Sequence, residues 1–440
     1  MKAVYTPVSG ANFATPPPPF LGIYAESSSP LINQSLTRLR FDHETGEVLG
    51  EKWSYEAALV ERYALQAQAR RAMLEAYRND SDGASKPHKV TRCRRWLRPR
   101  GKFEPVYAEV QQHVDTGRTF FTGTEICASP WACPVCSAKI AQSRADEVRL
   151  AVDQWIADGG ICLFVTLTIP HTRFDALGPM VQDFRRGLEL FRGGKGGAAI
   201  NAALGRVGVI RALEVTWGEL NGFHPHSHEI WFCRPVDGIP VGAILERWQQ
   251  SAVTAGFGRP SDAHGVKVDV VQSSEQAAAA LAEYLTKMGR ELPEDTTPPW
   301  GAAEELTRVH SKRGRLQQFT PWDFLRAQYD VEIFTADKIW YRELFAEYVQ
   351  AFKGMAQLFW SRGLKARFGI GDKSDVEVAE EFRESADSLA CLEPEQWAKL
   401  FVRADHRATV LIVAQRGGSE AVREFIDFLP SLSSTHGDTS

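Results

Sequence analysis

The chain has 440 residues, 44% of them hydrophobic and 24% charged, with a formal net charge of −4. These are ordinary values for a folded globular protein, and the length corresponds to about two to four domains. The sequence has no apolar run of about 18 residues, which excludes a helical membrane span, and it starts without the pattern of a signal peptide. We therefore expect a cytoplasmic protein.

The charges are unevenly distributed along the chain. Residues 1–290 carry 33 basic against 30 acidic residues, whereas residues 291–440 carry 18 against 25. Within the first part, residues 86–102 hold eight basic residues and no acidic one. A local basic patch suits phosphate contacts whatever the total charge, and the alternative is a solvated basic loop. The residues expected to bind DNA are Arg92, Arg94, Arg95, Arg98 and Arg100.

The first half of the chain predicts three kinds of segment. Residues 1–50 look irregular, with four consecutive prolines at 16–19, and a helix is expected from Ser54 to about Arg78. A linker at 79–87 leads to a short cysteine-bearing unit that ends near residue 140. A helix then runs from about residue 143 to the paired glycines at 159–160.

From residue 161 the pattern indicates an α+β domain. A buried central strand (161–169), a helix (176–191), a Gly-rich mobile loop (191–197) and a hairpin turning at 220–222 come first. A helix (243–255), a strand (266–272) and a helix (273–289) follow, and the chain then looks mostly helical to residue 429. This order predicts an antiparallel sheet with packed helices. The expected domains are 1–85, 86–145, 146–290 and 291–440.

Three cysteines lie within ten positions. Cys127, Cys133 and Cys136 form C-x5-C-x2-C, and the CPVC segment resembles a zinc knuckle. We expect a structural Zn²⁺ with Cys93 as the fourth ligand and His113 in reserve, in a small zinc-binding module that holds the basic stretch in place. The alternative is a redox dithiol or inert thiols. Three other cysteines, Cys162, Cys233 and Cys391, look like ordinary thiols.

Three histidines alternate along one expected strand. His224, His226 and His228 would project from the same face, and Glu214 would join them across the predicted hairpin. Two imidazoles and a carboxylate make an open metal site, whereas the alternative is a set of hydrogen-bonded structural histidines. His226 and His228 are the firmer ligands, because His224 lies near the turn and would instead contact DNA or cap the site. Pro225 cannot donate to a neighbouring strand, so this strand is expected to lie at a sheet edge or to start here.

A tyrosine and a lysine share one face of a later helix. Tyr284 and Lys287 lie three residues apart in AAAALAEYLTKMG. A nearby ammonium and a metal that polarises the electrophile would both help the hydroxyl attack. By itself the pair is a weak signal, since a half-buried tyrosine beside a surface lysine is common. The order of strand, histidine triplet and tyrosine makes it informative.

That order resembles the plasmid rolling-circle replication initiators of the HUH endonuclease superfamily. The similar segments are FVTLTIPH (164–171), RALEVTWGELNGFHPHSHEIWF (211–232) and EYLTKM (283–288), with CASPWACPVCSAKI (127–140), FTPWDFL (319–325) and KGMAQLFWSRGLK (353–365). The resemblance covers about residues 90–370. It implies an HUH nuclease domain of antiparallel sheet and helices, between the zinc module and a mainly helical C-terminal region.

The resemblance also implies a reaction. Tyr284 would attack a phosphodiester at the origin while His226, His228 and Glu214 hold Mg²⁺ or Mn²⁺, with Lys287 steering the phosphate. The products would be a 5′-phosphotyrosyl link and a 3′-OH primer, and the strand could be rejoined without ATP. The substrate would be supercoiled origin DNA extruded as a hairpin, with a host helicase and polymerase as partners. The alternatives are an HUH transposase or relaxase, or a non-catalytic zinc-stabilised DNA-binding regulator.

Two positions depart from the family pattern. Ser227 stands where the family has a bulky hydrophobic residue between the two histidines, and it should face away from the metal. Ala280 stands where some single-tyrosine initiators carry a glutamate that activates water. Glu283 is adjacent to Tyr284 but lies about 100° around the helix from it. Termination by water therefore lacks an evident base.

Overall fold

The computed structural model describes residues 55–79, 86–99, 105–271, 318–329, 334–380 and 385–430, and the backbone of two short strands, β1 (Arg40–Phe41) and β2 (Val48–Leu49). The predictions for the rest of residues 1–54, for Arg100, for the helix with Tyr284 and Lys287, and for the tail after residue 430 lie outside the described residues. Of the helices that the structure describes, none has the length and hydrophobicity needed to span a bilayer.

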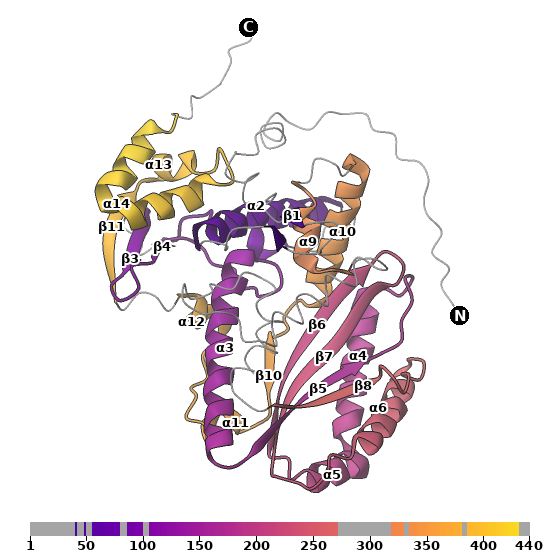
Figure 1. Cartoon of the computed structure of the whole chain (residues 1–440). Coiled ribbons are helices and arrows are strands. Elements are labelled where there is room, and N and C mark those ends of the chain that lie inside the picture. Colours follow the sequence, from indigo (N-terminus) through magenta and orange to yellow (C-terminus); the bar gives the residue numbers. More distant parts are fainter. Residues whose placement is uncertain are drawn as a thin grey trace.

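The main sheet is antiparallel throughout, which confirms the predicted α+β class (Figure 1). Its strand order is β10-β6-β7-β5-β8, and β9 also pairs with β6. The strands are β5 (Ile161–Thr168), β6 (Gly208–Gly218), β7 (Gly222–Cys233), β8 (Val266–Val271), β9 (Gln318–Phe319) and β10 (Leu358–Trp360). The long β6–β7 hairpin, which carries the histidine triplet, is therefore central.

The turn of that hairpin lies where the sequence predicts it. Gly218 pairs with Gly222, and three residues connect them. Gly222 has φ +71°, and a Cβ there would lie 2.8 Å from the Cα of Arg173. Only glycine meets both demands without strain. The turn fixes the register of every residue pair along the hairpin.

Of the two alternatives expected from Pro225, an edge strand was wrong, whereas the strand does start nearby, at Gly222. β7 lies between β6 and β5. β5 ends at Thr168, opposite His226, so Pro225 is just past the end of its neighbour. The missing N–H is tolerated because β7 has a partner on only one side at that position.

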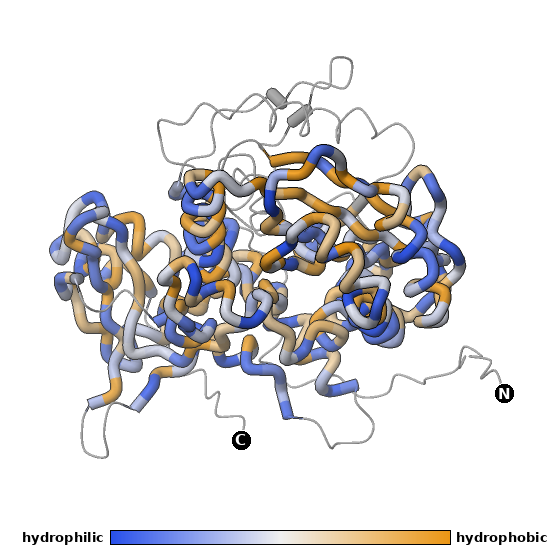
Figure 2. Tube along the Cα trace, turned by 90° about the horizontal axis from the view of Figure 1, so that it is seen from below, coloured by the Kyte–Doolittle hydropathy of each residue, from blue (hydrophilic) through white to orange (hydrophobic). Residues whose placement is uncertain are grey.

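Helices cover both faces of the main sheet, and Figure 2 shows its strands as largely hydrophobic. One face packs on α4 (Leu177–Arg192) and α6 (Val241–Ala255), through side chains such as Phe184 and Trp248. The other packs on α3 (Pro134–Ala157), whose Trp155 meets Phe232. Alternate residues of β5 and β7 fill the two cores, as expected for strands buried on both sides.

The expected mobile loop at 191–197 is instead the end of α4 and the start of a second helix, α5 (Gly194–Ala203). A Cβ at Gly197 would lie 2.1 Å from the carbonyl oxygen of Arg192. The guanidinium of Arg247 donates to the carbonyl oxygen of Gly193 at 3.0 Å. The glycines here allow close packing between helices, so the prediction of a mobile loop was wrong.

A second, three-stranded sheet has the order β11-β3-β4. Its strands are β3 (Ala108–His113), β4 (Thr119–Thr122) and β11 (Ala386–Leu392). It shares one core with α2 (Tyr55–Asn79), α13 (Pro394–Lys399) and α14 (His406–Phe428). The C-terminal region is thus less purely helical than expected: β11 joins the cysteine-bearing unit and β10 extends the main sheet.

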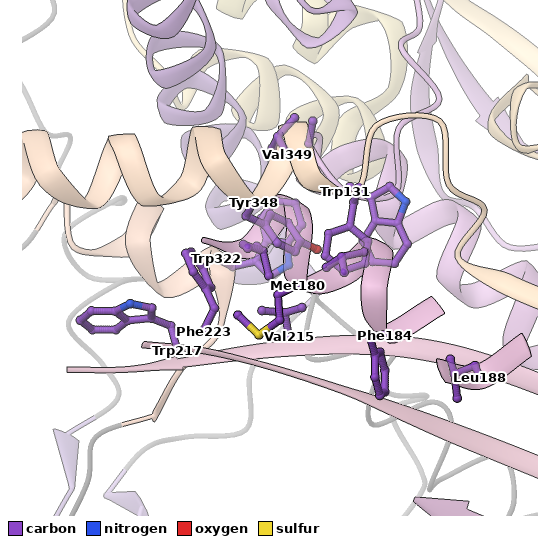
Figure 3. Close-up of a cluster of buried hydrophobic side chains, with 14 of the residues drawn as sticks. Trp131, Met180, Phe184, Leu188, Val215, Trp217, Phe223, Trp322, Tyr348 and Val349 are labelled. Atoms are coloured by element: carbon purple, nitrogen blue, oxygen red, sulfur yellow. The ribbon is translucent and has the colours of Figure 1, made fainter. Parts of the chain in front are cut away.

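The remaining described elements are η2 (Lys89–Thr91), α9 (Pro321–Arg326), α10 (Thr335–Ala351), α11 (Leu364–Arg367) and α12 (Asp375–Glu380). α9 and α10 bring an aromatic core onto one end of the β6–β7 hairpin, where Trp322 and Tyr348 meet Trp131 of the cysteine-bearing unit (Figure 3). One hydrophobic cluster contains residues from all four predicted domains. The domain boundaries therefore stay predictions.

Candidate metal centre and thiol cluster

Glu214, His226 and His228 converge on one face of the β6–β7 hairpin. Glu214 pairs directly with His226, and its Oε2 lies 2.8 Å from His226 Nε2 and 3.1 Å from His228 Nε2. Ligands about 2.1 Å from an octahedral Mg²⁺ or Mn²⁺ lie about 3.0 Å apart, so these spacings suit adjacent ligands of one ion. All three side chains are nearly buried, with 10%, 11% and 3% of their surface exposed.

Hydrogen bonds at the far side of each ring fix how the two imidazoles face Glu214. His226 Nδ1 donates to the backbone carbonyl of His224 at 3.1 Å, so in the neutral ring Nε2 carries the lone pair. That lone pair faces a carboxylate oxygen, and the two acceptors need a cation between them, either a proton or a metal ion. His228 Nδ1 is held by Thr166 Oγ1 at 3.1 Å. Such outer contacts are typical of metal-binding histidines.

His224 does not join this group of ligand atoms. Its Nδ1 lies 2.6 Å from His171 Nε2, and His171 Nδ1 donates to the carbonyl of Asn221 at 2.9 Å. Burial, with repulsion from His226 and His171, lowers the pKa of His224 to about 3, so the ring stays neutral. The structure thus pairs the third histidine with His171, beside the candidate metal ligands. Sequence reasoning missed His171, although it closes the FVTLTIPH segment.

A small cavity of about 40 Å³ lies beside Glu214. Trp131, Tyr348 and Gln357 are among its lining residues, and by volume it has room for about three waters. Gln357 Oε1 is buried there without a hydrogen-bond partner among the described residues. Burial and the charge of Glu214 both raise the pKa of Tyr348. Because Trp131 lies in the loop between Cys127 and Cys133 and also lines this cavity, it connects the cysteine-bearing loop to the candidate metal centre.

The opposite face of β7 carries a buried carboxylate that sequence reasoning missed. Glu229 is fully buried and accepts hydrogen bonds from Ser227 Oγ at 3.0 Å and Trp231 Nε1 at 2.8 Å, and it is ion-paired with Arg192 of α4. Burial alone would raise its pKa, but Arg192 and Arg211 hold that pKa below the usual value. Ser227 faces away from the candidate metal centre, as expected, and its hydroxyl donates a hydrogen bond to Glu229.

Replacing Glu229 by glutamine should destabilise the main sheet strongly. The substitution keeps the shape but leaves the half-buried guanidinium of Arg192 without a counter-charge, and breaking a buried ion pair costs about 3–5 kcal/mol. Urea unfolding would measure the loss, with the exposed Glu246→Gln on α6 as the control. A change below about 1 kcal/mol would mean that the pair behaves like a surface ion pair.

The four predicted cysteines form one buried cluster. The sulfur atoms of Cys93 and Cys133 lie 3.7 Å apart, those of Cys93 and Cys136 3.6 Å, and those of Cys127 and Cys136 3.7 Å. A tetrahedron with Zn–S bonds of about 2.3 Å has edges of about 3.8 Å. The fourth member is Cys93, as predicted; His113 lies at the end of β3, outside the cluster. The four thiols could therefore hold a tetrahedral metal ion.

The surroundings of the thiol cluster are positively charged. Arg94 and Arg407 are each 5% exposed, and they donate hydrogen bonds to backbone carbonyls, Gln66 and Thr124. Two buried guanidinium groups next to four neutral thiols would be very costly. Four thiolates around a dication carry a net charge of −2, which balances the two arginines. This charge match favours a bound dication over four neutral thiols.

Arg94 is therefore not placed to contact DNA, which corrects its predicted role. Arg94 directly follows Cys93 and has φ +52°. In the same way, Ala128 directly follows Cys127 and has φ +48°. These left-handed residues turn the chain back at the cluster, so that the N–H of Cys127 donates to Cys93 Sγ at 3.4 Å. The guanidinium of Arg94 points inward as a consequence.

Comparison with known proteins assigns the chain to a family. It is 30% identical over 330 residues to "Protein rep" of Streptomyces lividans, a match that covers 62% of this chain and 70% of that protein. The chain belongs to the Rep protein family. It is also 33% identical over 216 residues to a "Neomycin resistance protein" of Streptomyces cyanogenus, covering 38% of this chain and about half (48%) of that relative. Neither a family model nor a solved structure matches the chain.

The basic stretch of this Rep protein lies beside the thiol cluster, partly exposed. Arg98 is exposed and pairs with Glu380 at 2.6 Å, while Arg92 pairs with Glu125 at 3.4 Å and lies over the ring of Trp96. Trp96 is itself 52% exposed. Arg95 packs on Phe401. An exposed indole between arginines suits stacking on an unpaired base.

Removing His226 and His228 from the Rep protein should abolish metal binding at the hairpin. The His226→Ala/His228→Ala double variant loses both nitrogen ligands, so Mn²⁺ affinity should fall by a factor of about 100 or more. Titration calorimetry measures it, with His113→Ala as the control. Double-stranded DNA binding should persist, because it rests on phosphate contacts elsewhere. Loss of both properties would make these histidines structural.

Proposed function

We propose that this Rep-family protein is a plasmid rolling-circle replication initiator of the HUH type, which nicks one DNA strand at the origin and later rejoins it. The observation that carries the proposal is the Glu214–His226–His228 group on the central hairpin. Two imidazole nitrogens and one carboxylate oxygen leave several coordination positions for water and a phosphate oxygen. Bound Mg²⁺ or Mn²⁺ would polarise the scissile phosphate.

The proposed nucleophile is Tyr284, thirteen residues after the end of β8. Lys267 of β8 lies level with His228, because Thr166 of β5 pairs with both residues. The distance along β8 from Lys267 to its last residue, Val271, is about 13 Å. The sequence predicts a helix from Ser273, and eleven helical residues cover about 16 Å. A helix that turned back along the sheet would therefore bring Tyr284 level with His228. The chain length is compatible with attack at the metal centre.

In the proposed reaction the oxygen of Tyr284 forms a bond to phosphorus and the bond from phosphorus to the 3′ oxygen breaks. The tyrosine proton is lost and the 3′ oxygen gains a proton, which leaves a 3′-OH and a 5′-phosphotyrosyl link. Lys287 would stabilise charge on the phosphate. Because the phosphodiester energy is conserved in the link, the reverse attack rejoins the strand without ATP.

The proposed substrate is supercoiled plasmid origin DNA, with the cleaved strand unpaired in an extruded hairpin. Arg92, Arg95 and Arg98 would position the duplex through phosphates while Trp96 stacks on an unpaired base. A 3′-OH on a nicked circle is the primer that a host polymerase extends, and extension requires a host helicase. Zn²⁺ in the thiol cluster would hold this basic segment beside the nuclease, in the cytoplasm where plasmids replicate.

Two alternatives from the same superfamily are less well supported. Relaxases usually carry their tyrosine before the histidine motif, the reverse of the order here, and transposases lack the other similar segments. A non-catalytic zinc-stabilised DNA-binding regulator would have no need for the Glu214–His226–His228 group. The similarity to Protein rep over 70% of its length favours an initiator.

A nicking assay tests the proposal. Purified protein is incubated with a supercoiled plasmid that carries its own origin, with Mn²⁺ or with chelator. We expect open circles with covalently attached protein only when metal is present, and no product from a plasmid without the origin. Binding of the origin without any nicking under these conditions would favour the regulator.

A further inference from the structure

Three arginines gather around Glu229 on the face of the main sheet opposite the metal centre. Arg192 ends α4 and is ion-paired with Glu229, Arg211 lies on β6 directly opposite Glu229, and Arg206 stacks over Trp231 at 4.3 Å. All three are half-buried. The elements that bring them together are α4, the segment before β6, and β6 itself.

The cluster has more positive charge than its partners can balance. Three guanidinium groups face one carboxylate, whose oxygens already accept from Ser227, Trp231 and Arg192. Arg185 and Glu189 on α4 also act on Arg211, and their charges cancel. The excess is thus two positive charges. Burial and the repulsion from Arg192 lower the pKa of Arg211 to about 10.

Two donors in the cluster lack a partner. The Nε of Arg192 and an Nη of Arg206 are buried and make no hydrogen bond to any described residue. A buried donor without an acceptor costs free energy, and more so when it belongs to a charged group. Excess charge and unused donors together indicate a missing anion.

An aromatic ring lies next to the unused charge. Phe359 on β10 is 44% exposed and pairs with Arg211 across the sheet. The guanidinium carbon of Arg211 is 4.7 Å from the ring centre, and that of Arg192 is 5.9 Å away. A phosphate site beside an exposed ring matches one nucleotide unit, because a base can stack on the ring while its phosphate meets the arginines.

We propose that Arg192, Arg206, Arg211 and Phe359 form a binding site for one nucleotide of single-stranded nucleic acid, on the side of the sheet opposite Glu214, His226 and His228. The phosphate accepts from Arg192 Nε, from the unused Nη of Arg206 and from Arg211, and the base stacks on Phe359. The site is distinct from the basic stretch at residues 86–102. It would hold a strand on the back of the sheet while the front face remains free.

The test measures binding of a fluorescein-labelled oligothymidylate of about 20 nucleotides by anisotropy, over a range of salt concentrations. The variants are Arg211→Gln and Phe359→Leu, with Arg149→Gln on α3 as a control of equal charge change. We expect each site variant to bind about tenfold more weakly than the control. For Arg211→Gln, the slope of log binding constant against log salt concentration should also decrease in magnitude by about 0.7, the value for one phosphate of a single strand.

A second readout separates a nucleotide site from a purely structural cluster. Pyrophosphate should raise the melting temperature of the unmodified protein and of Phe359→Leu but not that of Arg211→Gln, because a ligand of the folded state stabilises it. If both site variants bind the oligonucleotide like Arg149→Gln, the proposal is overturned. If Phe359→Leu alone binds it normally, the site takes a free anion and the nucleotide assignment fails. Phe359→Leu leaves the arginines in place, so this result does not depend on Arg211→Gln folding.

Discussion

Replacing Tyr284 by phenylalanine should eliminate the covalent protein–DNA adduct. The substitution removes only the hydroxyl oxygen that would bond to phosphorus, and losing a nucleophile lowers turnover by a factor on the order of 10³ or more. Metal binding and origin binding should persist, because neither uses the phenol. Denaturing gel electrophoresis of a labelled origin strand, with Mn²⁺ present, measures the adduct directly.

The matched control is Tyr77→Phe, since Tyr77 is a partly exposed tyrosine (39%) on α2. It should form the adduct like the unmodified protein. An adduct that survives in Tyr284→Phe would remove Tyr284 from its proposed role and direct attention to another tyrosine. Loss of nicking together with loss of Mn²⁺ binding would indicate misfolding of the sheet rather than a missing nucleophile.

The metal centre was predictable because it depends on local rules. Alternation along β7 places His226 and His228 on one face, and a short hairpin turn fixes Glu214 opposite His226. The same rule placed Ser227 on the other face. The four cysteines were predictable for a similar reason, since three of them lie close together in the sequence and a tetrahedral site needs a fourth.

What failed depends on contacts between distant segments. No local pattern shows that β11 pairs with β3, about 275 residues earlier in the chain, or that the three residues of β10 extend the main sheet. The partner of Glu229 is Arg192 on α4, and nothing in the HSHEIW segment identifies it. Arg94 belongs to a basic stretch whose composition predicts DNA binding, but its left-handed backbone conformation directs its side chain toward the thiols. Charge in the sequence does not tell which side chains are buried.

The two candidate metal-binding groups are connected through one short loop. Between Cys127 and Cys133 the chain carries Trp131, whose Nε1 donates to the carbonyl of Met355 at 2.7 Å and whose ring packs on Phe352 at 4.4 Å between centres. The same tryptophan lines the cavity beside Glu214. The thiol cluster therefore fixes both ends of a loop that lines the cavity beside the candidate metal centre.

Replacing Cys133 and Cys136 by serine should release about one zinc per chain and unfold much of the N-terminal half. Cys133 precedes the first residue of α3 and Cys136 lies in its first turn, both fully buried. Zinc binding contributes about 10–16 kcal/mol in small structural sites, a large share of any domain's stability. Without the dication and its thiolates, Arg94 and Arg407 become uncompensated buried charges.

Elemental analysis measures the zinc and circular dichroism measures the melting temperature, with the exposed Cys391→Ser as the control. Cys391→Ser should keep both values. The double variant should also bind Mn²⁺ more weakly, because the loop with Trp131 no longer holds the wall beside Glu214. Unchanged zinc content in the double variant would reject the cluster as a metal site. Lost zinc with an unchanged melting temperature would show that Arg94 and Arg407 tolerate burial without the thiolate charge.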